Sequence, residues 1–152
     1  MSDARPSGDA RRLWARTRVA VGAEPLTLAS LPVDALGETA ALVGGLRAGF
    51  AALVLERDEV SLSVPTSAWV ASALRSRARA EAGPYRALTL DLDLDLGVVG
   101  YLAPAAARLA AAGVSIVPQC AFLKDHLLVR EDDLARALAV LEALAAECAL
   151  AD

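Results

Sequence analysis

Three aspartates spaced two apart form the pattern that most suggests chemistry, and they lie in the segment LTLDLDLDLG, residues 88–97. Asp91, Asp93 and Asp95, the aspartate row, alternate with leucines, so in a strand their carboxylates share one face. Such a row could hold a cation, but alternate strand residues lie about 6.5 to 7 Å apart, which hinders coordination of one small ion by neighbouring members. We therefore favour leucines facing a core and aspartates facing solvent or another sheet, and we predict no metal site.

Cys120, Lys124 and His126 form a second group with potential for chemistry, in a predicted hairpin of two strands. A cysteine next to a histidine is a common nucleophile and base. A two-residue turn at 123–124 would place Leu127 opposite Cys120 and direct Cys120 and His126 to opposite faces, whereas a three-residue loop would reverse that conclusion. We expect the short turn, with Cys120 as a small pocket or core residue, and we predict no catalytic residue.

The turn that ends the aspartate row contains Val98, Val99, Gly100 and Tyr101 and precedes a predicted helix. We refer to these four residues as the glycine turn. The N–H groups at the start of a helix have no acceptor within it and attract a carboxylate. Glycine also lets the backbone approach a ligand closely. The glycine turn is therefore the stronger candidate for a binding site.

The elements that position these residues follow from hydrophobic periodicity and from turn residues. Residues 1–16 show no useful period and mix glycine, proline and arginine, which predicts a flexible tail. Strands are predicted at 18–21, 26–31, 50–55, 60–64, 86–96, 114–122 and 126–129, and helices at 33–49, 66–81, 101–113 and 132–144.

These elements form two successive units of strand, helix, strand, strand, helix, strand, over residues 17–92 and 93–152. That order is typical of the α+β class and of the ferredoxin-like βαββαβ arrangement, with helices on one face of an antiparallel sheet. The strand over 86–96 is shared at the junction. The ending ECALAD is a poor strand, so the second sheet lacks its sequential fourth strand. Either residues 18–21 or a second copy of the chain fills that edge.

The composition narrows the classes of partner. With 152 residues, 56% hydrophobic content and a formal net charge of −4, the chain is expected to fold as a compact globular protein. The negative charge disfavours binding to nucleic acid or to an anionic membrane. No apolar run approaches the roughly 18 residues needed to span a bilayer, and the polar start lacks the apolar core of a signal peptide. We therefore expect a cytoplasmic protein with no nucleic-acid or membrane partner.

Motifs in the second unit resemble the ACT domain, a small ligand-binding module. They are Gly100-Tyr101-Leu102, Ala112-Gly113-Val114-Ser115-Ile116, the turn Leu123-Lys124-Asp125-His126, and Leu127-Leu128-Val129 with Glu131-Asp132-Asp133-Leu134. The first half resembles the family more loosely, and the whole is most similar to tandem ACT proteins related to eukaryotic arginine sensors. The departures lie in the turn, where Leu123 replaces an acidic residue and His126 replaces a tyrosine, while Asp125 remains.

The resemblance implies a regulatory protein that binds an amino acid or a related metabolite at an interface between ACT units. The backbone of the glycine turn would hold a carboxylate, and Asp125 would face an ammonium or guanidinium group. The expected ligand-binding residues are Val98, Val99, Gly100, Tyr101, Cys120, Phe122, Asp125 and His126. No cofactor is expected, and the expected assembly is a homodimer.

Two other functions fit the same sequence. One is an enzyme or biosynthetic accessory protein that reuses the fold, with chemistry at the hairpin of Cys120, Lys124 and His126. The other is a structural dimer with no pocket. The three hypotheses differ in whether the protein binds a metabolite, converts one, or does neither.

Overall fold

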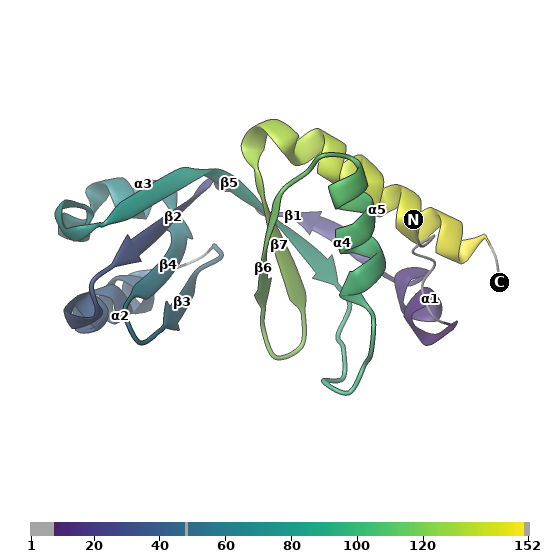
Figure 1. Cartoon of the computed structure of the whole chain (residues 1–152), viewed down its shortest axis with the longest axis horizontal. Coiled ribbons are helices and arrows are strands. Elements are labelled where there is room, and N and C mark those ends of the chain that lie inside the picture. Colours follow the sequence, from purple (N-terminus) through teal and green to yellow (C-terminus); the bar gives the residue numbers. More distant parts are fainter. Residues whose placement is uncertain (1–7, 48, 151–152) are drawn as a thin grey trace. The chain divides into compact units, whose positions relative to one another are not determined.

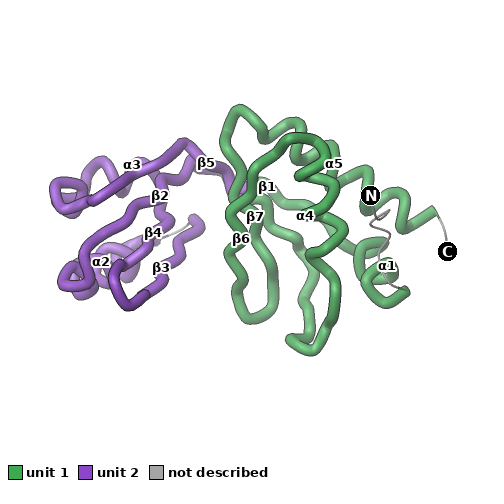
Figure 2. Tube along the Cα trace, in the orientation of Figure 1, with its two compact units in different colours: residues 1–21, 88–152 green, residues 22–87 purple. Residues whose placement is uncertain are grey.

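The chain forms two compact units in the computed structural model, which describes residues 8–47 and 49–150 (Figure 1, Figure 2). Unit 1 takes its residues from the ranges 1–21 and 88–152, and unit 2 is residues 22–87. The predicted domains, 17–92 and 93–152, differ from these units because the N-terminal segment belongs with the C-terminal part of the chain. Within the described residues, no helix is both long and apolar enough to cross a membrane.

Unit 2 is a ferredoxin-like unit with the antiparallel sheet order β3–β4–β2–β5. Its elements are β2 (Leu26–Leu31), η1 (Val33–Ala35), α2 (Leu36–Gly45), β3 (Ala52–Leu55), β4 (Val60–Pro65), α3 (Thr66–Ala71), η2 (Ala73–Arg77) and the first part of β5 (Ala80–Asp91). Val60, Leu62 and Val64 alternate with serines along β4 and are fully buried, as the period of two predicts. They share a core with Leu31 of β2 and Trp69 of α3.

The helix predicted over 66–81 is wrong in its second half. Helix α3 ends after six residues, and Ser72 adopts an extended conformation with φ −85° and ψ 137°. The Ser72 hydroxyl accepts a hydrogen bond from the Leu74 N–H at 3.2 Å. This local bond competes with continuation of the helix and begins the 3₁₀ turn η2 instead, after which the chain enters β5.

Unit 1 is a second ferredoxin-like unit, with sheet order β1–β5–β7–β6. Its elements are α1 (Gly8–Trp14), β1 (Arg18–Val21), the last part of β5, α4 (Leu102–Ala111), β6 (Ile116–Cys120), β7 (Asp125–Arg130), η3 (Glu131–Asp133) and α5 (Leu134–Ala149). Helices α4 and α5 lie side by side and cover one face of this sheet (Figure 1). Leu88 and Leu90 of β5 and Leu127 and Val129 of β7 form the core beneath them.

Strand β1 completes the sheet of unit 1 at the edge that has no sequential fourth strand. It pairs antiparallel with β5, with Val19 opposite Leu90 and Val21 opposite Leu88. The edge is therefore filled from within the chain, which decides between the two alternatives that the sequence leaves open.

Part of the predicted flexible tail is a structured part of unit 1. Residues 8–14 form the short helix α1, which packs against α5, and Trp14 at its end is fully buried in the core of the unit. The expectation of a flexible tail over 1–16 is therefore wrong for residues 8–16. Residues 1–7 lie outside the described residues.

Strand β5 ends at Asp91, whereas the alternation predicts a strand over 86–96. Its partner β1 begins at Arg18, which lies opposite Asp91, so the pairing with β1 extends no further. The predicted faces are confirmed up to Asp95, because Leu92 and Leu94 still pack on the core and the aspartate row is exposed, whereas Leu96 is 72% exposed. Among the described residues, no group of three or more histidine, cysteine, aspartate or glutamate side chains could hold a metal ion.

Deleting residues 1–21 should destabilise the protein strongly, because the deletion removes β1 and the buried Trp14 together. Truncation of a buried tryptophan alone costs about 3 to 5 kcal/mol of unfolding free energy. We expect the shortened chain to unfold at a clearly lower urea concentration, measured by circular dichroism. Leu150→Ala, at an exposed position, is the control and should unfold like the full chain. An unchanged midpoint for the deletion would contradict the place of α1 and β1 in unit 1.

Candidate functional site

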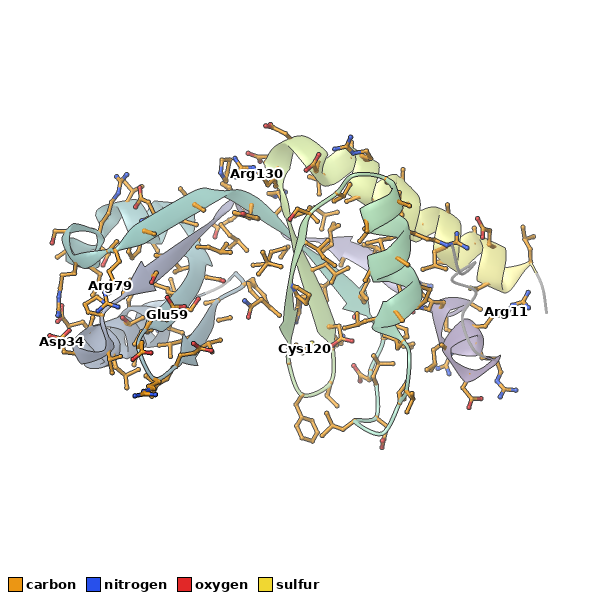
Figure 3. The ribbon with its side chains drawn as sticks, viewed as in Figure 1. Arg11, Asp34, Glu59, Arg79, Cys120 and Arg130 are labelled. Atoms are coloured by element: carbon orange, nitrogen blue, oxygen red, sulfur yellow. The ribbon has the colours of Figure 1, made fainter. Side chains whose placement is uncertain are left out.

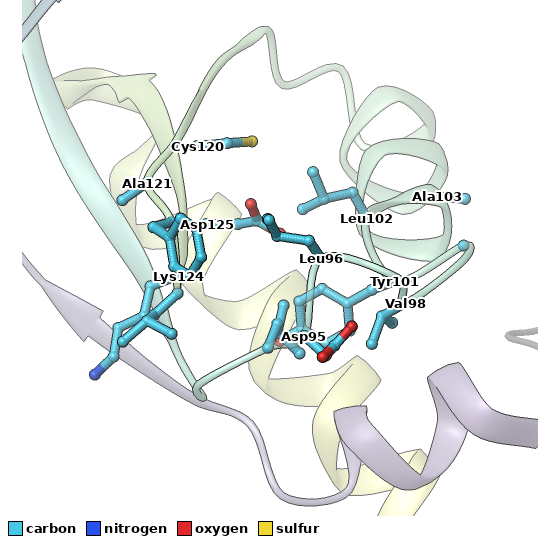
Figure 4. Close-up of a pocket in the computed structure, with 14 residues that line it drawn as sticks. Asp95, Leu96, Val98, Tyr101, Leu102, Ala103, Cys120, Ala121, Lys124 and Asp125 are labelled. Atoms are coloured by element: carbon cyan, nitrogen blue, oxygen red, sulfur yellow. The ribbon is translucent and has the colours of Figure 1, made fainter.

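A pocket of about 350 Å³ lies in unit 1, between the loop after β5, the start of α4 and the end of the β6–β7 hairpin (Figure 4). Its volume is within the range of small-molecule sites, which measure about 300 to 1,000 Å³. The lining residues come from 94–96, 98, 100–103 and 120–125. Three segments of different kinds therefore converge on one cavity.

The first wall is the loop after β5, which folds into a hydrogen-bonded turn. The carboxylate of Asp95 accepts a hydrogen bond from the Gly97 N–H at 2.7 Å, and its carbonyl accepts one from the Val98 N–H at 3.1 Å. An aspartate that bonds the backbone two residues on is typical of such turns. The Leu94 N–H donates to the Leu123 carbonyl at 2.8 Å, which ties the loop to the hairpin.

The second wall is the start of α4, whose first N–H groups have no acceptor within the helix. Leu102 and Ala103 occupy the first two helical positions, and Pro104 in the third has no N–H. The N-cap residue Tyr101 makes no side-chain capping hydrogen bond. Gly100, just before it, has φ +81°, a conformation that favours glycine over residues with a Cβ. This end of the helix carries partial positive charge and attracts a carboxylate.

The third wall is the hairpin of β6 and β7, and its register differs from the predicted one. A four-residue loop at 121–124 replaces the predicted two-residue turn, so Cys120 lies opposite Asp125 instead of Leu127. Because the shift is two residues, each side chain stays on its predicted face. Figure 4 shows Cys120 and Asp125 pointing from the hairpin toward Leu102 across the pocket.

His126 does not line the pocket, because it lies on the opposite face of β7 from Asp125. Its Nδ1 is 2.9 Å from the hydroxyl of Thr89 on β5. Burial lowers the pKa of His126, which favours the neutral ring. Cys120 and His126 point to opposite faces, as expected, and do not form a nucleophile and base pair.

The environment of Cys120 disfavours ionisation of its thiol. The Asp125 carboxylate accepts a hydrogen bond from the thiol, and together with partial burial this raises the pKa of Cys120 to about 11. Tyr101 is also held in its neutral form, because burial raises the pKa of its hydroxyl to about 12. At neutral pH both groups keep their protons, so neither supplies a nucleophilic anion.

The ammonium group of Lys124 is engaged by the aspartate row. It forms an ion pair with Asp91 and a second one, at 3.5 Å, with Asp93. The hydrogen bond between Lys124 and Asp91 raises the pKa of the lysine and lowers the pKa of the aspartate. Figure 4 shows the Lys124 side chain extending away from the other lining residues. The carboxylates of Asp95 and Asp125 therefore give the pocket lining a negative charge.

Most of the predicted ligand-binding residues come together in this pocket. Those that line it are Val98, Gly100, Tyr101, Cys120, Phe122 and Asp125. Val99, which is 83% exposed, and His126 do not line it. The lining residues that were not predicted are Leu94, Asp95, Leu96, Leu102, Ala103, Ala121, Leu123 and Lys124. The triplet Asp95-Leu96-Gly97 carries a turn signal that the regular alternation concealed.

Unit 2 has a smaller hollow of about 210 Å³ among β2, β4 and β5. Its acidic residue, Glu81, accepts hydrogen bonds from Trp69 Nε1 and from Arg75 Nη2, each at 2.7 Å. Figure 3 labels three further charged residues of this unit, Asp34, Glu59 and Arg79, which are likewise held by hydrogen bonds within unit 2. Since these charged groups are already partnered, the pocket of unit 1 is the stronger candidate for a binding site.

The comparisons with known proteins bear on the same region. Residues 82–143 match the profile of the ACT domain family. This segment includes the glycine turn, helix α4, the β6–β7 hairpin and most of α5. A search of curated proteins gives no match.

Solved structures share the fold along most of the chain. A Vibrio cholerae protein of unknown function, a possible transport protein, has a TM-score of 0.70 and 20% identity, with 89% of this chain and 94% of that chain covered. A protein from Agrobacterium tumefaciens has a TM-score of 0.68 and 18% identity, with 85% and 89% covered. The ligand-free regulatory subunit of aspartate kinase from Thermus thermophilus has a TM-score of 0.61 and 8% identity, with 84% and 97% covered. At these identities the likeness establishes the fold.

Cys120 should react slowly with iodoacetamide at pH 8, because at a pKa of about 11 only about one thiol in a thousand is ionised. Asp125→Asn removes the negative charge beside the thiol, so the pKa of Cys120 should fall and alkylation should accelerate at least about tenfold. Mass spectrometry distinguishes this site from the buried Cys148.

Asp95→Asn is the matched control, because the Asp95 carboxylate bonds the Gly97 N–H, whereas the raised pKa of the thiol comes from Asp125 and from burial. It should leave the alkylation rate of Cys120 unchanged. Equal rates for the native chain and for Asp125→Asn would contradict the hydrogen bond between Cys120 and Asp125.

Proposed function

We propose that this chain, whose residues 82–143 match the ACT domain family, binds an amino acid or a related small metabolite and acts as a regulatory protein. The observation that carries the proposal is the opposite polarity of two walls of one pocket. The first N–H groups of α4 lie on one wall, and the Asp125 carboxylate lies on another. An α-amino acid carries one group suited to each, a carboxylate and an ammonium.

In the binding mode that we infer, the ligand carboxylate accepts hydrogen bonds from the first turn of α4, and the ligand ammonium donates to Asp125. A Cβ added at Gly100 would meet no atom within 4 Å, which leaves room for a ligand beside the backbone. Leu96 and Phe122, 72% and 75% exposed, stand at the rim of the pocket and offer apolar cover for the ligand's side chain.

The regulatory part of the proposal is supported by analogy of fold. The regulatory subunit of aspartate kinase from Thermus thermophilus matches this chain over 97% of its own length. We infer that ligand binding to this chain alters its association with a partner protein. A tandem ACT arrangement, a homodimer, a cytoplasmic location and the likeness to the arginine-sensor-related group stay predictions.

The other two hypotheses have less support. An enzyme at the hairpin would need Cys120, Lys124 and His126 to converge, but the thiol has a raised pKa, the ammonium pairs with Asp91, and the ring lies on the opposite face. A structural dimer without a pocket is disfavoured by a cavity of about 350 Å³. Binding without turnover is the function that fits these residues best.

Isothermal titration calorimetry with each of the twenty common amino acids should detect binding of at least one. Asp125→Ala should weaken that binding about tenfold to a hundredfold, because a hydrogen bond to a charged group contributes about 1.5 to 3 kcal/mol. The dissociation constants of the native chain and of the variant provide the comparison.

Asp58→Ala provides the control for this titration. It makes the same substitution in a turn of unit 2, where the side chain is 89% exposed, and should leave the dissociation constant unchanged. Binding of none of the twenty amino acids, or an equal loss in both variants, would count against the proposed function.

A further inference from the structure

The buried side of the glycine turn contacts the N-terminal segment of the chain. Trp14, at the end of α1, is fully buried, and its Nε1 donates a hydrogen bond to the Tyr101 carbonyl at 2.8 Å. The two rings stack, with centroids 5.1 Å apart and planes inclined by 17°. Tyr101 lines the pocket and is the N-cap residue of α4. Trp14 therefore holds the residue at which the turn becomes a helix.

Thr17 holds the other end of the same tyrosine. Its Oγ1 lies 2.9 Å from the Leu13 carbonyl and 2.7 Å from the Tyr101 hydroxyl oxygen. A threonine hydroxyl has a single hydrogen, which is donated to the Leu13 carbonyl, so the Tyr101 hydroxyl is the donor to Thr17. Burial raises the pKa of Tyr101 to about 12, so the donor keeps its proton at physiological pH. The N-terminal segment thus holds both the backbone and the side chain of Tyr101 through hydrogen bonds.

The residues just before Tyr101 have little packing of their own. Val99 is 83% exposed, and Gly100 is exposed, with φ +81° and open space on its Cβ side. Exposed segments with few buried contacts open at low free-energy cost. Val98 packs on the core and its N–H bonds the Asp95 carbonyl, so the position of Gly100 and of the helix start after it depends on how firmly Tyr101 is held.

We propose that Trp14 and Thr17 are positioning residues for the pocket, acting through Tyr101 to hold the first N–H groups of α4 in place for a ligand carboxylate. This inference rests on the proposed function and deepens it, because it makes the affinity of the pocket depend on the segment 8–21. Donors that are ordered before binding give tighter complexes, since the entropy cost of ordering them is met during folding.

Hydrogen–deuterium exchange without any added ligand tests the positioning directly. Trp14→Phe keeps an aromatic ring and removes the indole N–H, and Thr17→Val removes the acceptor of the Tyr101 hydroxyl. Each substitution should speed exchange about tenfold at the amides of 105–107, whose helical hydrogen bonds to the carbonyls of 101–103 form the first turn of α4, while the amides of α5 in the same unit keep their rates. Unchanged exchange at 105–107 in both variants, or an equal rise in α5, would overturn the inference.

Two matched variants serve as controls for exchange. Thr17→Ser keeps the hydroxyl and should exchange at 105–107 like the native chain. Trp69→Phe makes the same substitution as Trp14→Phe in unit 2, where the indole donates to Glu81, and should leave exchange at 105–107 unchanged. Faster exchange in either control would show that the response is not specific to the bonds at Tyr101, and would overturn the inference.

Tryptophan fluorescence tests the coupling to the pocket, because the chain has two tryptophans. Trp69→Phe leaves Trp14 as the single emitter, and Trp14→Phe leaves Trp69. The probe is an equimolar mixture of the twenty common amino acids in calorimetry, and the same mixture without tryptophan in fluorescence, because free tryptophan would itself emit. The emission of Trp14 should shift and that of Trp69 should stay constant. The calorimetric affinity for the mixture should also fall about tenfold in Trp14→Phe.

The two experiments separate this inference from the proposed function. Heat of binding without a change in Trp14 emission, or with unchanged affinity in Trp14→Phe, would overturn the positioning role and leave the proposed function standing. If the mixture gives no heat with the native chain, the proposed function fails, and exchange at 105–107 alone decides the positioning role.

Discussion

A single strand, β5, supplies the fourth strand of unit 2 and the first strand of unit 1, and the arrangement of the rest of the chain depends on this double use. Residues 80–85 pair with β2, and residues 88–91 pair with β1. Since α5 is followed by no described strand, the fourth position in the sheet of unit 1 is filled by β1. The N-terminal segment is thereby built into unit 1, and α1 comes to lie against α5, where Trp14 reaches Tyr101.

Periodicity in the sequence predicts the strands and helices that have one apolar face, but not the ends of these elements. The leucines of 88–94 alternate without a break, yet β5 stops at Asp91, where its pairing with β1 ends. A strand needs a hydrogen-bonded neighbouring strand as well as an alternating sequence. Helix α1 is not predicted, because it forms without a clear sequence pattern. It has only seven residues, and the two that are buried, Ala10 and Trp14, are too few to establish a helical period.

The candidate site is predictable to the extent that it follows from local chemistry. A glycine before a helix indicates exposed N–H donors whatever surrounds it, so the glycine turn could be found from the sequence. The hairpin register could not, because the loop 121–124 contains neither glycine nor asparagine to specify a turn type. The error of two residues preserves the faces but changes the partner of Cys120 from Leu127 to Asp125. That partner sets the chemistry, since an aspartate raises the pKa of the thiol and a leucine would not.

The aspartate row affects the charge of the pocket, although Asp95 is its one member that lines the pocket. Asp91 and Asp93 hold the ammonium of Lys124, the basic side chain of the pocket lining, and draw it toward the strand. The positive polarity that remains at the pocket comes from the N–H groups of α4, which attract a carboxylate but do not neutralise the carboxylates of Asp95 and Asp125. A ligand that carries only negative charge would be repelled by these two carboxylates and would have no positive group to bind them. A ligand that carries both charges, each at its own end, satisfies both walls, which is why a zwitterionic amino acid fits this pocket better than a simple anion.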